Sequence, residues 1–150
     1  TLFPELREWH REVEAVLNHT RTLHNLQGFP RTFFMPWGDD LFKAAYAFVP
    51  QSTVGCITAD AFCDMQDYIE QEHLKDWDLL NDKHDSYLLQ VPDDPEVVKH
   101  ARTKMEEFMN RDLVSPRGEH FKMRSSTSVG YNWQPYDETE NPLGLQDMED

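Results

Sequence analysis

The chain has 150 residues, with 28 Asp or Glu against 14 Lys or Arg, so its formal net charge is −14. Nucleic acid and anionic membranes bind clustered cations, so this charge argues against either as the default partner. No apolar run approaches the roughly 18 residues that a membrane span needs. Four Trp, nine Phe and five Tyr supply bulk for a hydrophobic core, which argues against full disorder.

The negative charge is concentrated in two parts of the chain. Residues 60–100 hold twelve acids and three bases, and residues 131–150 hold six acids and no base. The remaining segments, 1–59 and 101–130, are nearly neutral. Each acidic stretch is either a solvated face that keeps the protein soluble or a docking surface for a basic partner.

The N-terminal segment has the clearest helical periodicity. Pro4 suits a first helical turn and Gly28 a stop, which predicts a helix over residues 4–26. The apolar positions step by three and four residues, as in a heptad seam: Leu6, Trp9, Val13, Val16, Thr20 and Leu23. Such a seam must be buried against other helices.

An aromatic-rich, irregular loop follows over residues 27–37. Its five large apolar residues are Phe29, Phe33, Phe34, Met35 and Trp37. We interpret the loop as a plug over the core, with an exposed contact for a partner as the alternative. Residues 40–48 then have one apolar helical face, and Pro50 predicts the end of that helix.

Three further helices are predicted, over residues 58–74, 76–89 and 95–112. The first two follow from apolar residues at spacings of three or four, although residues 86–91 could instead form a short strand. The third has the strongest start signal in the chain, with Asp94 as N-cap, Pro95 at the first position and Glu96 behind it.

Periodicity stops after Ser115, and the C-terminal residues have the composition of a docking segment. Aromatic anchors for a pocket are followed by carboxylates for a basic rim. The candidate partner-binding residues are Tyr131, Trp133, Tyr136, Asp137, Glu138 and Glu140. The Ser125–Ser128 cluster beside Arg124 is either a phosphorylation site or a flexible linker.

Pairs of His and Glu at helical spacing suggest an alternative, a metal site inside a helical bundle. The pairs are His10 with Glu14, Glu70 with His73, and Glu96 with His100. Only Glu70 and His73 have the Glu-x-x-His form of di-iron bundles, and a second copy is missing. Structural or surface histidines are the simpler interpretation, so we expect no cofactor, with a transition metal under the alternative.

Two cysteines, Cys56 and Cys63, exclude a disulfide framework and favour a reducing intracellular compartment, although a single bridge stays open. The sequence therefore predicts a mainly α protein: a four- to five-helix bundle with an aromatic-rich inter-helix loop and an extended acidic C-terminal arm. Residues 1–130 would form the helical domain and residues 131–150 the arm. We expect a non-catalytic interaction or accessory subunit that docks on a basic protein, with a metalloprotein or an acidic mimic of nucleic acid as the competing hypotheses.

Overall fold

The computed structural model describes residues 3–148, and this part of the chain is an α+β structure. Its three helices are α1 (Pro4–Thr20), α2 (Asp39–Gln71) and α3 (Pro95–Met109). Its strands form four separate antiparallel pairs: β1 (Thr22–His24) with β2 (Pro30–Thr32), β3 (Asp78–Lys83) with β4 (Ser86–Gln90), β5 (Asp112–Val114) with β6 (His120–Lys122), and β7 (Ser128–Val129) with β8 (Gln146–Asp147).

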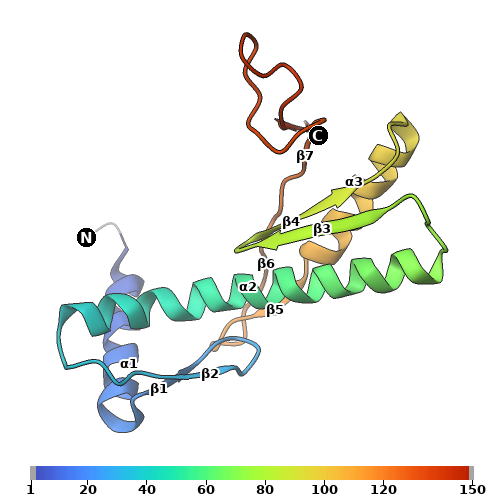
Figure 1. The fold of residues 1–150 in the computed structure, drawn as a ribbon. Helices are drawn as coiled ribbons and strands as arrows, with labels where there is room; N and C mark the ends of the chain where they lie inside the picture. Colours follow the sequence, from blue (N-terminus) through green and yellow to red (C-terminus); the bar gives the residue numbers. More distant parts are fainter. Residues whose placement is uncertain (1–2, 149–150) are drawn as a thin grey trace.

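The prediction of a four- to five-helix bundle is wrong. The expected helices 40–48 and 58–74 are one continuous helix, α2, which runs across the whole molecule (Figure 1). Pro50 lies inside α2 and does not end it. A proline inside a helix removes the hydrogen bond to the carbonyl four residues earlier, and its ring crowds that carbonyl, at a cost of about 3 kcal/mol. Packing of α2 against hydrophobic residues on both sides of Pro50 offsets this cost.

Residues 76–89 were predicted as a helix, and they form most of the β3–β4 hairpin instead. Trp77, which directly precedes β3, belongs to the same hydrophobic cluster as Leu79, Tyr87 and Leu89 of the two strands, and Trp77 and Tyr87 are buried. Leu79 lies opposite Leu89 in the strand register. The strand alternative for residues 86–91 is therefore confirmed, since β4 spans Ser86–Gln90.

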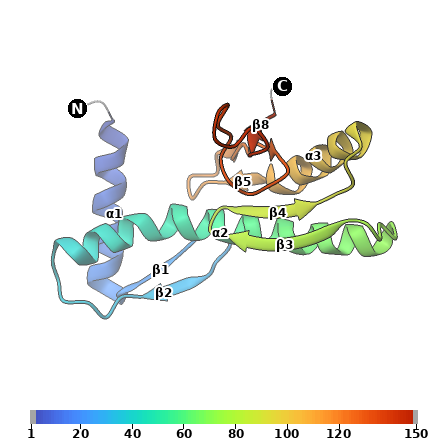
Figure 2. The same ribbon diagram turned by 45° about the horizontal axis from the view of Figure 1, so that its top comes forward.

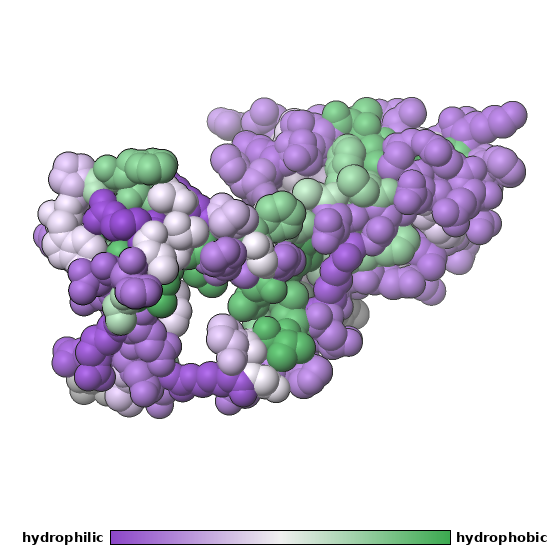
Figure 3. Space-filling model, turned by 90° about the horizontal axis from the view of Figure 1, so that it is seen from below, coloured by the Kyte–Doolittle hydropathy of each residue, from purple (hydrophilic) through white to green (hydrophobic). Residues whose placement is uncertain are grey.

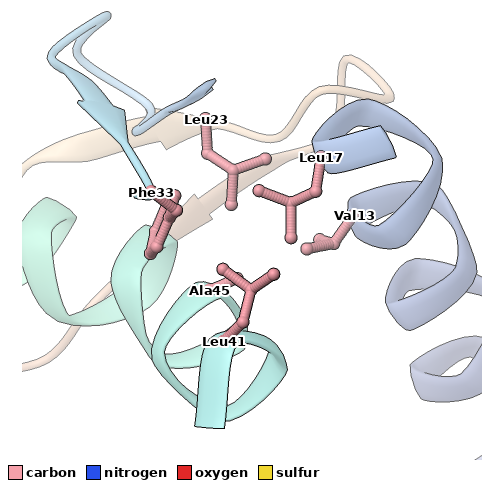
Figure 4. Packing of buried hydrophobic residues seen from close by; sticks show 6 residues of the cluster. All are labelled: Val13, Leu17, Leu23, Phe33, Leu41 and Ala45. Carbon is pink, nitrogen blue, oxygen red and sulfur yellow. The ribbon is translucent and has the colours of Figure 1, made fainter. Parts of the chain in front are cut away.

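Two separate hydrophobic clusters lie along α2. The N-terminal cluster joins α1, the β1–β2 hairpin and the start of α2, and its side chains point toward one another (Figure 4); its buried residues are Val13, Leu17, Leu23, Phe33, Leu41 and Ala45. The C-terminal cluster joins the second half of α2 to β3–β4 and α3 (Figure 2); its buried residues are Ala61, Met65, Ile69, Trp77, Tyr87 and Ala101. The molecule is thus organised around one helix and two small cores.

The first helix is shorter than predicted, and its buried face is rotated from the expected seam. Arg21 ends α1 in the left-handed conformation with φ 59°, and its N–H donates to Leu17 O. Its side-chain Nε donates to Phe33 O at 3.0 Å, so the chain turns back toward the β1–β2 hairpin. Val13 and Leu17 are the buried residues of α1, whereas Leu6 and Val16 of the predicted seam are exposed.

Asn25 builds the turn of the β1–β2 hairpin and joins it to α2. Its buried Oδ1 accepts hydrogen bonds from Gln27 N at 3.0 Å and Phe29 N at 2.9 Å. The N–H of Leu26 then donates to Thr53 Oγ1, at 3.4 Å. A buried polar side chain is stable when it is bonded in this way, so Asn25 sets the position of the hairpin on α2.

The third helix agrees closely with prediction. Asp94 Oδ1 accepts from Glu96 N at 2.9 Å and from Val97 N at 3.2 Å, which is the expected N-cap. The helix ends at Met109, three residues before the predicted end. Arg111 follows it, and its guanidinium pairs with Asp60 and Asp64 of α2. These two ion pairs hold the end of α3 against α2.

The chain exposes more surface than a compact monomer of its size. Its accessible area is 10873 Å² at a mass of 17.7 kDa, whereas a compact protein of that mass exposes about 8,000 Å². On the face in Figure 3, hydrophilic residues cover most of the end that carries α3 and β3–β4, and hydrophobic ones gather in the middle. Among the described residues, no helix combines the length and apolarity needed to cross a membrane.

Both cysteines lie on α2 as free thiols, with Cys56 half-buried and Cys63 exposed. Seven residues on one helix correspond to a rise of about 10 Å. That separation exceeds the roughly 7 Å limit between the Cα atoms of a disulfide, so these two cysteines do not bridge in this structure.

Candidate docking surface

The C-terminal arm is folded rather than extended, which corrects the predicted extended arm. It leaves the body after β6 and returns on itself, so that Ser128 pairs with Asp147 and Val129 with Gln146 (Figures 1 and 2). Between these strands, Tyr131 N donates to Leu143 O at 2.8 Å and Leu145 N to Gln134 O at 2.8 Å. The candidate binding residues are therefore held on a closed loop.

Two glycines and one asparagine allow the arm to close. A Cβ on Gly130 would lie 2.5 Å from Gly144 O, and a Cβ on Gly144 would lie 2.5 Å from Pro135 O. The side chain of Asn141 fills the middle of the loop, where its Nδ2 donates to Pro135 O at 2.9 Å and to Asn132 Oδ1 at 3.1 Å. These backbone approaches leave no room for a side chain at either glycine.

The arm presents its aromatic residues to solvent. All residues from 131 to 140 are exposed. Tyr131 is 71% exposed, and Trp133 and Tyr136 are each close to half exposed. Leu143 adds a fourth exposed apolar side chain from the returning half of the loop. Exposed aromatic and apolar side chains of this kind are the usual anchors of protein–protein contacts.

In the described part of the chain, a hydrogen bond and a cation–π contact attach the arm to the rest of the molecule. Tyr131 donates from its hydroxyl to Asp93 Oδ2 at 2.9 Å, and this hydrogen bond with the nearby negative charge raises the pKa of Tyr131. The ammonium of Lys83, at the end of β3, lies 5.7 Å from the centre of the Trp133 ring. These contacts place the arm beside β3–β4 and the start of α3.

The acidic residues of the arm begin with a tight turn. Asp137 Oδ1 accepts hydrogen bonds from the N–H groups of Thr139 and Glu140, both at 2.8 Å. These two bonds, led by the one from Glu140, lower the pKa of Asp137. Glu138 and Glu140 are exposed in the same turn. The arm thus carries three carboxylates beside its exposed aromatic residues, and their role in binding a partner stays a prediction.

The other acidic stretch surrounds the attachment point of the arm. The acids between residues 60 and 100 are all exposed, and they lie on the second half of α2, on β3–β4 and at the start of α3. Of these, Asp60 and Asp64 pair with Arg111, and Asp93 pairs with Tyr131. The acidic stretch and the acidic arm therefore share one end of the molecule.

The three predicted metal-ligand pairs lie in different places and have other contacts. His10 stacks on the Tyr46 ring at 3.8 Å, and Glu14 accepts a hydrogen bond from the Tyr46 hydroxyl at 2.5 Å. Burial, followed by this bond, raises the pKa of Tyr46 to about 12. The structure thus uses His10 and Glu14 to join α1 to α2.

The remaining two pairs also fail to converge. Glu70 accepts from Gln66 at 2.7 Å, and His73 lies beyond the end of α2 with φ 55°. His100 Nε2 lies 2.8 Å from the Tyr68 hydroxyl, and Glu96 is exposed in the first turn of α3. Within residues 3–148, no group of three or more His, Cys, Asp or Glu side chains could hold a metal ion.

Further exposed aromatic and apolar side chains lie on the segment from the β1–β2 turn to the start of α2. Phe33 is buried, as the plug interpretation predicts, but Phe29, Phe34, Met35 and Trp37 are exposed, with Phe34 at 90%. We call these four residues the N-terminal aromatic surface. Most of this loop is therefore exposed and does not cover the core, and its contact with a partner stays a prediction. The Pro and Gly residues around it are the feature of the sequence that indicates an exposed, irregular segment.

Comparison of the chain with protein-family models, with curated proteins and with solved structures found no match.

Proposed function

We propose that this protein is a non-catalytic interaction module that docks on a protein partner with a basic surface. The C-terminal arm is the contact, and the acidic stretch around its attachment point adds long-range attraction. The observation that carries the proposal is the folded arm, whose residues 131–140 are all exposed although the loop is internally bonded.

The chemistry of the arm supports a basic, pocketed partner. Exposed Tyr131, Trp133 and Tyr136 supply the apolar contact area, and Asp137 with its neighbouring carboxylates supplies the charge. Because the loop is closed before binding, docking costs little conformational entropy compared with ordering a free peptide. The large accessible area of the chain is a second, independent support, since it leaves surface to be buried by a partner.

The proposal is tested by capturing partners with the full chain from extracts of the cells that produce it. A W133A/Y136A variant should lose one or more basic proteins that the wild-type chain retains, and release of those proteins should increase with salt. The matched control is F29A/F34A, which removes the same number of exposed aromatic rings from the N-terminal aromatic surface. Retention of the same proteins by W133A/Y136A would remove the main support for the proposal.

The metalloprotein hypothesis stays a prediction of the sequence, because no observation among the described residues favours it. Elemental analysis of protein purified without a His tag tests it directly. If the protein contains a stoichiometric metal, and if that metal is lost when Glu70 and His73 are changed, the metalloprotein hypothesis would be favoured over the docking proposal.

A further inference from the structure

A basic, polar cavity of about 620 Å³ lies beside residues 123–127, the segment that joins β6 to β7. Among the residues that the structure describes, Arg102, Lys122 and Arg124 line it together with one acid, Glu106. Apart from Met148, its lining comes from residues 101–130, where six bases exceed four acids in a chain of net charge −14. Positive charge is therefore gathered at this cavity against the overall charge of the molecule.

Glu106, the acid found among the described residues of the cavity, is already paired. Glu106 Oε1 accepts from Arg102 Nε at 2.7 Å and from Thr127 Oγ1 at 3.4 Å. Ser125 N and Oγ both donate to Asn110 Oδ1, at 2.8 and 3.1 Å, which holds the connecting segment against the end of α3. These hydrogen bonds hold the walls of the cavity in place and do not involve the side chains of Lys122, Arg124 and Ser126.

Three donors at the cavity have no strong acceptor. Over residues 3–148, the structure shows no hydrogen bond or ion pair for the side chains of Arg124 and Ser126. Lys122 Nζ lies 3.5 Å from Asp112 Oδ1, with both side chains more than half exposed, and such a pair contributes little. A guanidinium, an ammonium and a hydroxyl are therefore available at one cavity.

We propose that this cavity binds an oxyanion of the phosphate class. The planar guanidinium of Arg124 donates two parallel hydrogen bonds to such a group, Lys122 supplies a point charge, and Ser126 donates its hydroxyl. The Arg102–Glu106 pair stays in place as a wall. The site is independent of the docking proposal, because none of these three residues belongs to the aromatic or acidic surface of the arm.

The binding site is tested by titrating the full chain with inorganic phosphate and, separately, with O-phosphoserine, at low ionic strength and with isothermal calorimetry. We expect saturable binding with one site per chain. R124Q should weaken it about tenfold or more, because a charge-assisted bidentate contact is lost. K99Q is the matched control: it removes one positive charge from an exposed residue of α3 that does not line the cavity, and it should change the affinity less than twofold.

Each result decides the proposal. Absence of saturable binding, equal affinity of R124Q and wild type, or an equal loss in K99Q would overturn it, the last because the attraction would then be diffuse. Circular dichroism of R124Q checks that the fold is kept, and R124K serves as a second variant that retains charge and should bind weakly. Tighter binding of O-phosphoserine would assign the site to a phosphorylated polypeptide, and tighter binding of inorganic phosphate would assign it to the free ion.

Discussion

At the scale of single residues, the fold of the arm depends on residues that have no charged or reactive side chain. Gly130 and Gly144 let two backbone segments approach, and Asn141 occupies the space between them. The sequence singles out the aromatic residues and acids of the arm by composition, and the structure exposes them, but their role as a binding group stays a prediction. It could not identify the two glycines, since the need for a missing side chain arises only when the loop closes.

The first prediction concerns Gly144. In G144A the added methyl group would lie 2.5 Å from Pro135 O and 2.7 Å from Gln134 O, so the loop must open or distort. We expect a loss of about 1–3 kcal/mol in local stability of the arm. Hydrogen exchange of residues 131–147 measures it directly.

The matched glycine control is G55A. Gly55 lies within α2 with no atom near its missing Cβ, so alanine should stabilise the helix by about 1 kcal/mol. Equal exchange rates of the arm in G144A and wild type would show that the loop is looser than described.

The second prediction concerns Asp137 and pH. Its folded pKa is lowered by the N–H groups of Glu140 and Thr139. The carboxylate therefore stabilises the turn at pH values above the unfolded pKa of about 4, and this contribution is lost as the pH falls through the lower folded value. Exchange of the Thr139 and Glu140 amides, relative to an unbonded exposed amide, should rise below pH 4.

Two variants separate charge from hydrogen bonding at this position. D137N keeps an acceptor oxygen, so the turn should stay closed and exchange of its amides should no longer show the effect of Asp137 protonation. D137A has no acceptor and should open the turn at all pH values. A D137A variant with amide protection equal to that of wild type would be inconsistent with this role.

At the scale of elements, the sequence predicted helices best where local signals and packing agree. Asp94 and Pro95 start α3 as expected, because capping acts within one turn. The spacing of Trp77, Tyr87 and neighbouring apolar residues also fits a helix, so it does not reveal the hairpin at Asp78–Gln90. Pro50 was taken as a stop, but packing of α2 on both clusters carries the helix through it.

The third prediction follows from the rotated face of α1. Leu17 is fully buried in the N-terminal cluster, whereas Leu6, which the predicted seam would have buried, is half exposed. L17A should cost about 2–5 kcal/mol in the free energy of unfolding of that cluster, and L6A less than about 1 kcal/mol. Thermal or urea unfolding compares the two, and equal costs would show that α1 packs through the seam after all.

At the scale of the whole molecule, one long helix carries two small cores, with the N-terminal aromatic surface on the segment before α2 and the acidic arm beside β3–β4 and the start of α3. The sequence located the negative charge correctly along the chain, but it could not bring residues 60–100 and the arm together, because that contact depends on how β3–β4 and α3 fold over α2. The accessible area of 10873 Å² and the exposed aromatic residues are the observations on which the docking proposal rests.

The central claim is that the arm docks on a basic protein surface, and site-specific photo-crosslinking tests it most directly. The photoreactive residue p-benzoylphenylalanine replaces Tyr136 in the full chain, with the same residue at the exposed Leu80 as a control, and adducts are mapped by mass spectrometry. The docking account predicts an intermolecular adduct from position 136 to a basic surface of another protein, reduced by salt and weaker from position 80. Adducts from position 136 that fall only within this chain, or partners with no basic surface, would contradict it.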